Sequence, residues 1–150
     1  MDIFTYIKKD HEAVSALFKK AIAAKGQQRQ QYFETIAAEL LLHAKSEEKT
    51  FYAAIKEQAK DEELQDKMPH AKEEHEEIVE WINNVSKEKT DSDQWLIAFG
   101  ELKHAVEHHV KEEEEEIFPK AKKVIDKAQA VELAKKMDEL KASQKKKMAA

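Results

Sequence analysis

The chain contains no cysteine, only two glycines and only two prolines among its 150 residues. Without cysteine it can form no disulfide, no thiolate metal site and no thiol nucleophile. The scarcity of glycine and proline, in a sequence rich in Ala, Glu, Lys and Leu, favours long helices over sheet structure. We therefore predict an all-α protein. Its length is that of one ordinary domain and is sufficient to bury a real core.

Long apolar runs are also absent, and no stretch approaches the length that spans a membrane. The start of the chain lacks both the basic and the apolar segments of a secretion signal. The net charge of −5 disfavours nucleic-acid binding, which needs a clustered basic face, and the basic run 145–147 is too short to supply one. We expect a cytoplasmic monomer or weak homodimer that binds neither membranes nor nucleic acids.

Apolar residues recur at alternating steps of three and four, which is the pattern of amphipathic helices. The apolar stripes run from Phe4 to Ala21, Phe33 to Ala54, Leu64 to Val85, Trp95 to Phe118 and, less regularly, Val124 to Leu140. We predict an up-down-up-down four-helix bundle over residues 1–120. Residues 121–150 are expected to form an extra C-terminal helix, packed on the outside of the bundle and ending in a frayed basic tail.

Turn-forming and capping residues separate the predicted helices. We expect Gly26 to end the first helix. Asp61 and the segment 90–93 offer N-cap side chains for the third and fourth helices. Pro69 either kinks the third helix or marks its true start, and Pro119 ends or kinks the fourth.

Each of the four bundle stripes contains one histidine near its middle: His11, His43, His75 and His109. In an antiparallel hairpin, two residues lie at the same height when the turn is halfway between them. The midpoints of the successive histidine pairs fall at the predicted turns, and at about 1.5 Å of rise per residue the remaining offsets are small. The four histidines should therefore meet in one layer of the core.

Two of these histidines have a glutamate four residues later on the same helix face, since Glu47 follows His43 and Glu113 follows His109. An imidazole and a carboxylate in this arrangement can reach one metal ion, and the carboxylate can bridge to a second. Buried carboxylates without a cation would be costly. Mixed ligation of this kind suits iron, manganese or zinc. We predict a dinuclear metal site with the ligands His11, His43, Glu47, His75, His109 and Glu113.

Less specific interpretations stay open at this point. A single core histidine is more often a hydrogen-bonded packing residue than a ligand, and His–Glu pairs arise by chance in glutamate-rich helices. One alternative is a helical bundle that holds zinc or manganese without redox chemistry, and another is a metal-free interaction module. His70, His108 and the rest of the run 112–116 fall off the stripes, so we expect them to face mainly solvent or to support the ligands from behind.

The quoted motifs resemble those of the hemerythrin-like, or HHE cation-binding, domain family: DHEAV with His11, HAKSEE with His43 and Glu47, EEHEEI with His75, and HVKEEEEEIFP with His109 and Glu113. The resemblance covers about residues 1–120. It implies a non-haem di-iron protein, with two oxo- or hydroxo-bridged iron ions held by terminal histidines and bridging glutamates. Such a protein binds or reacts with O2, peroxide or NO, or handles iron. The resemblance does not decide whether it is an enzyme.

The sequence departs from the oxygen-carrying members of that family, which have a second histidine four residues before the histidine of the third helix. Ala71 occupies that position here, and the neighbouring His70 points off the stripe by about 100°. The sequence leaves open whether His70, Glu74 or a water molecule fills the coordination position that this second histidine would occupy. The resemblance therefore implies a more open site, better suited to reacting with O2, peroxide or NO than to reversible O2 carriage.

Overall fold

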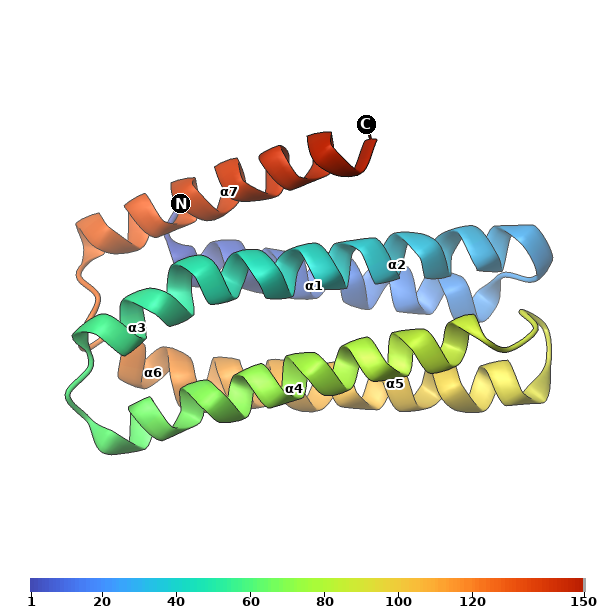
Figure 1. The fold of residues 1–150 in the computed structure, drawn as a ribbon, viewed down its shortest axis with the longest axis horizontal. Coiled ribbons are helices and arrows are strands. Elements are labelled where there is room, and N and C mark those ends of the chain that lie inside the picture. The colour runs from blue at the N-terminus through green and yellow to red at the C-terminus, as the bar shows by residue number, and fades with distance from the viewer. Residues whose placement is uncertain (150) are drawn as a thin grey trace.

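The structure, a computed structural model, describes residues 1–149, and these form helices and no strands. Four long helical rods make up the bundle (Figure 1). They begin with α1 (Ile3–Ala23), α2 (Gly26–Glu47), α4 (Glu62–Ser86) and α5 (Asp93–Glu112). The second rod continues through the π-helical segment η1 (Glu48–Tyr52) into α3 (Ala53–Gln58), and the fourth through η2 (Glu113–Ile117) into α6 (Phe118–Ala121). The predicted up-down-up-down four-helix bundle with an additional C-terminal helix is confirmed.

The rods are arranged as two antiparallel hairpins, α1 with α2 and α4 with α5, which Figure 1 shows as two layers. The additional helix α7 (Lys127–Ala149) lies across α1 and α2 on the outside of the bundle. Its helical structure includes the exposed basic residues 145–147. Ala150 lies outside the described residues, and the division of the chain at residue 120 stays a prediction. Within residues 1–149, no helix is both long enough and apolar enough to cross a membrane.

The apolar core consists of two clusters, one toward each end of the bundle. One contains Ile7, Ala71 and Ile117 together with the inner face of α7, and the other contains Val14, Leu40, Ile78 and Val106. Each predicted ligand histidine falls in sequence between a residue of one cluster and a residue of the other. The histidine layer therefore lies between two apolar regions that hold its helices in place.

The helix boundaries agree with the predicted caps at two places. The Asp61 side chain accepts a hydrogen bond from Glu63 N at the start of α4, and the Ser92 side chain accepts one from Trp95 N at the start of α5. Pro69 lies inside α4, which continues through it, so the alternative that it marks the helix start is wrong. Pro119 lies in α6 directly after the π-helical segment η2, and the fourth rod continues through it to Ala121.

The prediction for Gly26 was wrong. The helix α1 ends at Ala23 with Ala24 as its C-cap, and Gly26 is the first residue of α2. Its φ of 59° lies in the left-handed region that favours glycine. The Gly26 N–H also donates to the Asp91 carboxylate, at 3.1 and 3.0 Å, in the turn before α5. Glycine is therefore needed for the positive φ that reverses the chain, rather than to stop α1.

Candidate metal centre

The four stripe histidines meet in the core at one level of the bundle. The ring centroids of His11 and His43 are 5.2 Å apart, and those of His75 and His109 are 4.6 Å apart. The Nε2 atoms of His75 and His109 approach to 3.1 Å. Each pair combines neighbouring helices of one hairpin, as the equal-height argument required.

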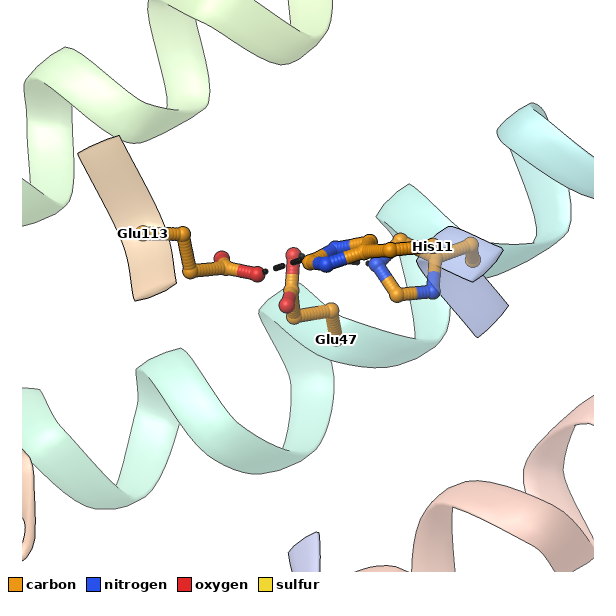
Figure 2. A group of neighbouring side chains, drawn as sticks. His11, Glu47 and Glu113 are labelled. Atoms are coloured by element: carbon orange, nitrogen blue, oxygen red, sulfur yellow. Dashed lines mark ion pairs between the residues drawn. The ribbon is translucent and has the colours of Figure 1, made fainter. Parts of the chain in front are cut away.

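The two stripe glutamates lie between these histidines and are fully buried. Glu47 Oε1 lies 3.5 Å from His43 Nε2 and 3.2 Å from His75 Nε2. The Glu113 oxygens lie 3.3 Å from His11 Nε2 and 3.5 Å from His109 Nε2. Figure 2 shows the His11 and Glu113 side chains pointing toward each other, with Glu47 beside them. Each carboxylate thus contacts one histidine of each hairpin.

These side chains form two groups that could each hold a cation. One group combines His11, His43, Glu47 and Glu113, and the other combines Glu47, His75 and His109. The candidate ligand atoms in each group lie within 4.8 Å of one another. The contacts of 3.2–3.5 Å match the spacing of about 3 Å between ligand atoms that surround one ion at about 2 Å. Glu47 belongs to both groups, so its carboxylate lies within reach of both candidate ion positions.

A carboxylate holds the outer nitrogen of every one of the four rings. His11 Nδ1 donates to Glu114 at 2.7 Å, and His43 Nδ1 donates to Asp10 at 2.8 Å. His75 Nδ1 donates to Glu48 and His109 Nδ1 donates to Glu74, both at 2.7 Å. Metal-bound histidines typically donate their second ring nitrogen in this way, which fixes the ring and leaves Nε2 for the ion. All four Nε2 atoms face the glutamates.

Several inward-facing polar atoms have no hydrogen-bond partner among the described residues. These atoms are His11 Nε2, His43 Nε2, both carboxylate oxygens of Glu47, and Glu113 Oε1. Unsatisfied buried polar atoms are costly, and their convergence on one place is what a cation site would produce. The donor set of four imidazoles and two carboxylates therefore fits a metal pair.

Charge interactions inside this layer are strong. Burial would lower the pKa of His43, but the Glu47 and Asp10 carboxylates raise it to about 10. Burial would raise the pKa of Glu113, but His109 and His11 hold it well below its usual range. The metal-free layer is thus stabilised by protons on the imidazoles, and a binding cation would displace them.

A pH dependence follows for the metal-free protein. The folded-state pKa of His43, about 10, lies above its ordinary value of 6.5. The stabilisation from its proton is complete below about pH 6.5 and is lost as the pH rises toward about 10. We expect the Tm of the metal-free protein to fall over that range, measured by circular dichroism. A His43→Gln variant should show a shallower fall. An unchanged Tm in the unsubstituted protein would contradict this.

The histidine-holding carboxylates include Asp10 and Glu48, whose role sequence reasoning missed, and Glu114, which belongs to the run expected to face solvent or to support the ligands from behind. Asp10 precedes His11 directly, while Glu48 and Glu114 directly follow Glu47 and Glu113. A residue beside a ligand is rotated by about 100° around the helix, so it faces the neighbouring helix instead of the centre. A carboxylate directly beside His11, Glu47, His75 or Glu113 in the sequence is the signal that would have found them. Glu74, considered as a filler for the Ala71 position, is instead occupied with His109.

Both π-helical segments begin at the end of a His-x-x-x-Glu pair. The segment η1 begins directly after Glu47, and η2 begins at Glu113. The wider π turn lets two consecutive residues after each glutamate face the core, Phe51 with Tyr52 and Ile117 with Phe118, all of them buried. The Tyr52 hydroxyl donates to Glu113 Oε2 and lies 3.4 Å from His109 Nε2. Burial and the Glu113 carboxylate raise the pKa of Tyr52 well above its ordinary value, so the hydroxyl keeps its proton.

The C-terminal helix reaches this site through Lys141, which is buried. Its Nζ donates to both Asp10 oxygens, at 2.8 and 2.7 Å, while Asp10 accepts from His43 Nδ1. The ammonium and the imidazole together lower the pKa of Asp10 against the opposing effect of burial. The helix α7 therefore helps to keep Asp10 ionised and oriented behind His43.

Replacing Asp10 by asparagine should lower metal affinity by about 10–100-fold, because the amide holds the His43 ring less firmly. Competition with a chelator would measure this. Asp138→Asn is the matched control, since Asp138 accepts from Tyr6 on the surface of α7 and contacts no histidine of the layer. Equal affinities for Asp10→Asn and the unsubstituted protein would contradict the role given to Asp10.

A small cavity lies against the histidine layer. Its volume is ≈ 30 Å³, and its walls combine the four histidines with aliphatic side chains that include Leu40, Ile78 and Val106. One water needs about 10–15 Å³ on the same measure. The cavity therefore has room for a molecule slightly larger than one water, but not for a larger substrate. Ala71 is buried in the neighbouring apolar cluster and offers no ligand there.

The family model of the hemerythrin HHE cation binding domain matches residues 2–121, so the chain belongs to that family. One solved structure with a similar fold is a hemerythrin HHE cation binding domain-containing protein from Mycobacterium kansasii. The two chains are 21% identical, the match covers 100% of this chain and 93% of that one, and the TM-score is 0.83. Among curated proteins no match was found. This protein is thus a cation-binding helical bundle of the hemerythrin class, and its histidine and glutamate clusters fit metal binding.

Proposed function

We propose that the protein is a non-haem di-iron protein that binds and reacts with O2, peroxide or NO. The observation that carries the proposal is the pair of ligand groups that share Glu47, each completed by histidines whose Nδ1 atoms are held by carboxylates. In this assignment His11, His43, His75 and His109 are terminal ligands. Glu47 and Glu113 bridge, because each contacts histidines of both hairpins.

The cavity beside the histidines supports a small ligand. It has room for a diatomic molecule or a peroxide, and its aliphatic lining favours apolar gases over ions. Ala71 leaves the coordination position of the family's fifth histidine without a protein ligand, which favours reaction over simple carriage. When bound, an iron pair would supply the electrons and the open coordination positions for such a reaction.

The protein's own residues have defined parts in this proposal. The four carboxylates behind the rings fix the imidazoles, and the Tyr52 hydroxyl holds a proton at Glu113 Oε2. The apolar clusters on both sides exclude water from the layer. A second function that the same ligands could serve is to take up and release iron. Measurements of iron uptake and release would separate that function from reaction with oxidants.

The test is metal content by elemental analysis together with an optical spectrum, on protein expressed with iron and exposed to air. About two irons per chain with near-ultraviolet absorption of a ferric pair are expected. His104→Ala, which removes an exposed histidine outside the layer, should behave identically. A single ion per chain, or zinc or manganese in preference to iron, would overturn the di-iron proposal. No metal after reconstitution would overturn the metal centre altogether.

A further inference from the structure

A second group of histidines and glutamates lies between α4 and α5, outside the layer described above. It contains two further His-x-x-x-Glu pairs, His70 with Glu74 on α4 and His108 with Glu112 on α5. We call these four residues the outer cluster. The spacing places both members of each pair on one helix face, as in the inner pairs.

The four side chains converge from the two helices. His70 Nε2 lies 3.4 Å from Glu74 Oε2 and 3.5 Å from Glu112 Oε2. His108 Nε2 lies 3.4 Å and 3.7 Å from the same two oxygens. Two imidazole nitrogens thus face one oxygen from each of two carboxylates. Ligand atoms at about 2.0–2.1 Å from a tetrahedral ion are about 3.3 Å apart, so these four contacts are close to the edges of such a site.

Glu74 supplies an independent observation. Its side chain is 8% exposed, and its Oε1 accepts from His109 Nδ1 of the inner layer. Its Oε2 is buried, has no hydrogen-bond partner and points at the outer cluster. A buried, unpartnered carboxylate oxygen is costly unless a cation or a donor satisfies it.

The cluster also holds two carboxylates close together. One ligand atom each from His70, Glu74 and Glu112 lies within 4.8 Å of the others, and Glu112 is only partly buried. Like charges at this distance repel, and a divalent ion would convert the repulsion into attraction. Both imidazoles are more than half exposed, so an ion has access from solvent.

We propose that His70, Glu74, His108 and Glu112 form a second cation site, at the surface, for one divalent transition-metal ion of the zinc type. Two imidazoles and two carboxylates suit zinc, and the imidazoles suit the harder calcium and magnesium ions poorly. The site is distinct from the inner layer and shares with it only the Glu74 carboxylate. It does not depend on the inner centre being iron.

The experiment is a titration of the iron-loaded full chain with Co²⁺, followed by visible absorption, and with Zn²⁺ in competition. We expect one saturable equivalent of tetrahedral Co²⁺ that Zn²⁺ displaces, while the iron content stays unchanged. His70→Ala/His108→Ala should lose that equivalent and keep the inner metals. Glu74 is left intact because it also holds His109. His104→Ala is the matched control, an exposed histidine on α5 outside the cluster, and it should retain the equivalent.

The same titration in a His43→Leu/Glu47→Leu background separates the two centres. If the inner centre fails to bind iron, the outer equivalent should still appear there and still be lost on removing His70 and His108. The proposal is overturned if no saturable equivalent binds in either background. It is also overturned if the equivalent survives in His70→Ala/His108→Ala, or if His104→Ala removes it equally well.

Discussion

Replacing Glu47 by glutamine is expected to reduce the bound metal from about two ions per chain to less than one. Glu47 is fully buried and belongs to both inner ligand groups, so its loss affects both positions at once. The glutamine amide keeps the shape of the side chain but carries no charge to offset the cations. Elemental analysis of iron-reconstituted protein would measure the change.

Glu116→Gln is the matched control for that substitution. Glu116 lies in η2, three residues after Glu113, but its side chain is 55% exposed and pairs with Lys67 at 3.7 Å on the surface. This variant should bind as much metal as the unsubstituted protein. Retention of two ions by Glu47→Gln would rule out Glu47 as the shared bridge.

The double substitution His43→Leu/Glu47→Leu should stabilise the metal-free protein, by about 1–4 kcal/mol in free energy of unfolding. It replaces a buried ionic pair with apolar side chains, and their desolvation cost disappears together with the unsatisfied Glu47 oxygens. In a His70→Ala/His108→Ala background, which lacks the outer cluster, metal should raise the Tm of the protein with the intact inner layer and leave that of the His43→Leu/Glu47→Leu variant unchanged. Denaturant unfolding with and without added metal would measure both effects.

The single substitution His43→Leu provides the comparison. It removes one histidine partner of the buried Glu47 carboxylate and leaves His75 at 3.2 Å. The expected cost is therefore positive but smaller than the cost of breaking an isolated buried pair, which is about 3–5 kcal/mol. A double variant less stable than the single variant would contradict this account. A His43→Leu/Glu47→Leu variant whose Tm still rises on adding metal in the background without the outer cluster would contradict the ligand assignment.

The fold and the ligand layer were accessible from the sequence because both depend on periodicity. Each stripe of apolar residues defines a helix face, and the turns near Gly26, Asp61 and Ser92 set the heights of the four histidines. The histidine heights still match although Gly26 starts α2 instead of ending α1, since a shift of a few residues moves a turn by only a few ångströms.

The remaining features depend on contacts between elements, which periodicity does not describe. The π turns at the ends of the two His-x-x-x-Glu pairs place consecutive residues in the core, so Ile117 is buried beside Phe118 although a regular α-helical stripe would bury only one of them. Lys141 reaches Asp10 only because α7 folds back over α1, a placement that no local pattern in residues 121–150 indicates. The outer cluster likewise forms only when α4 and α5 lie side by side.

The two-hairpin arrangement gives the histidine layer a mechanical role as well. Helix contacts are concentrated within the α1–α2 hairpin and within the α4–α5 hairpin, and α2 touches α4 much less. His11 and His43 belong to the first hairpin, and His75 and His109 belong to the second. In a chain that cannot form disulfides, a cation held by all four would act as a removable cross-link at the middle of the bundle. Resistance to proteolysis, and with it the lifetime of the protein in the cell, would then follow the supply of metal.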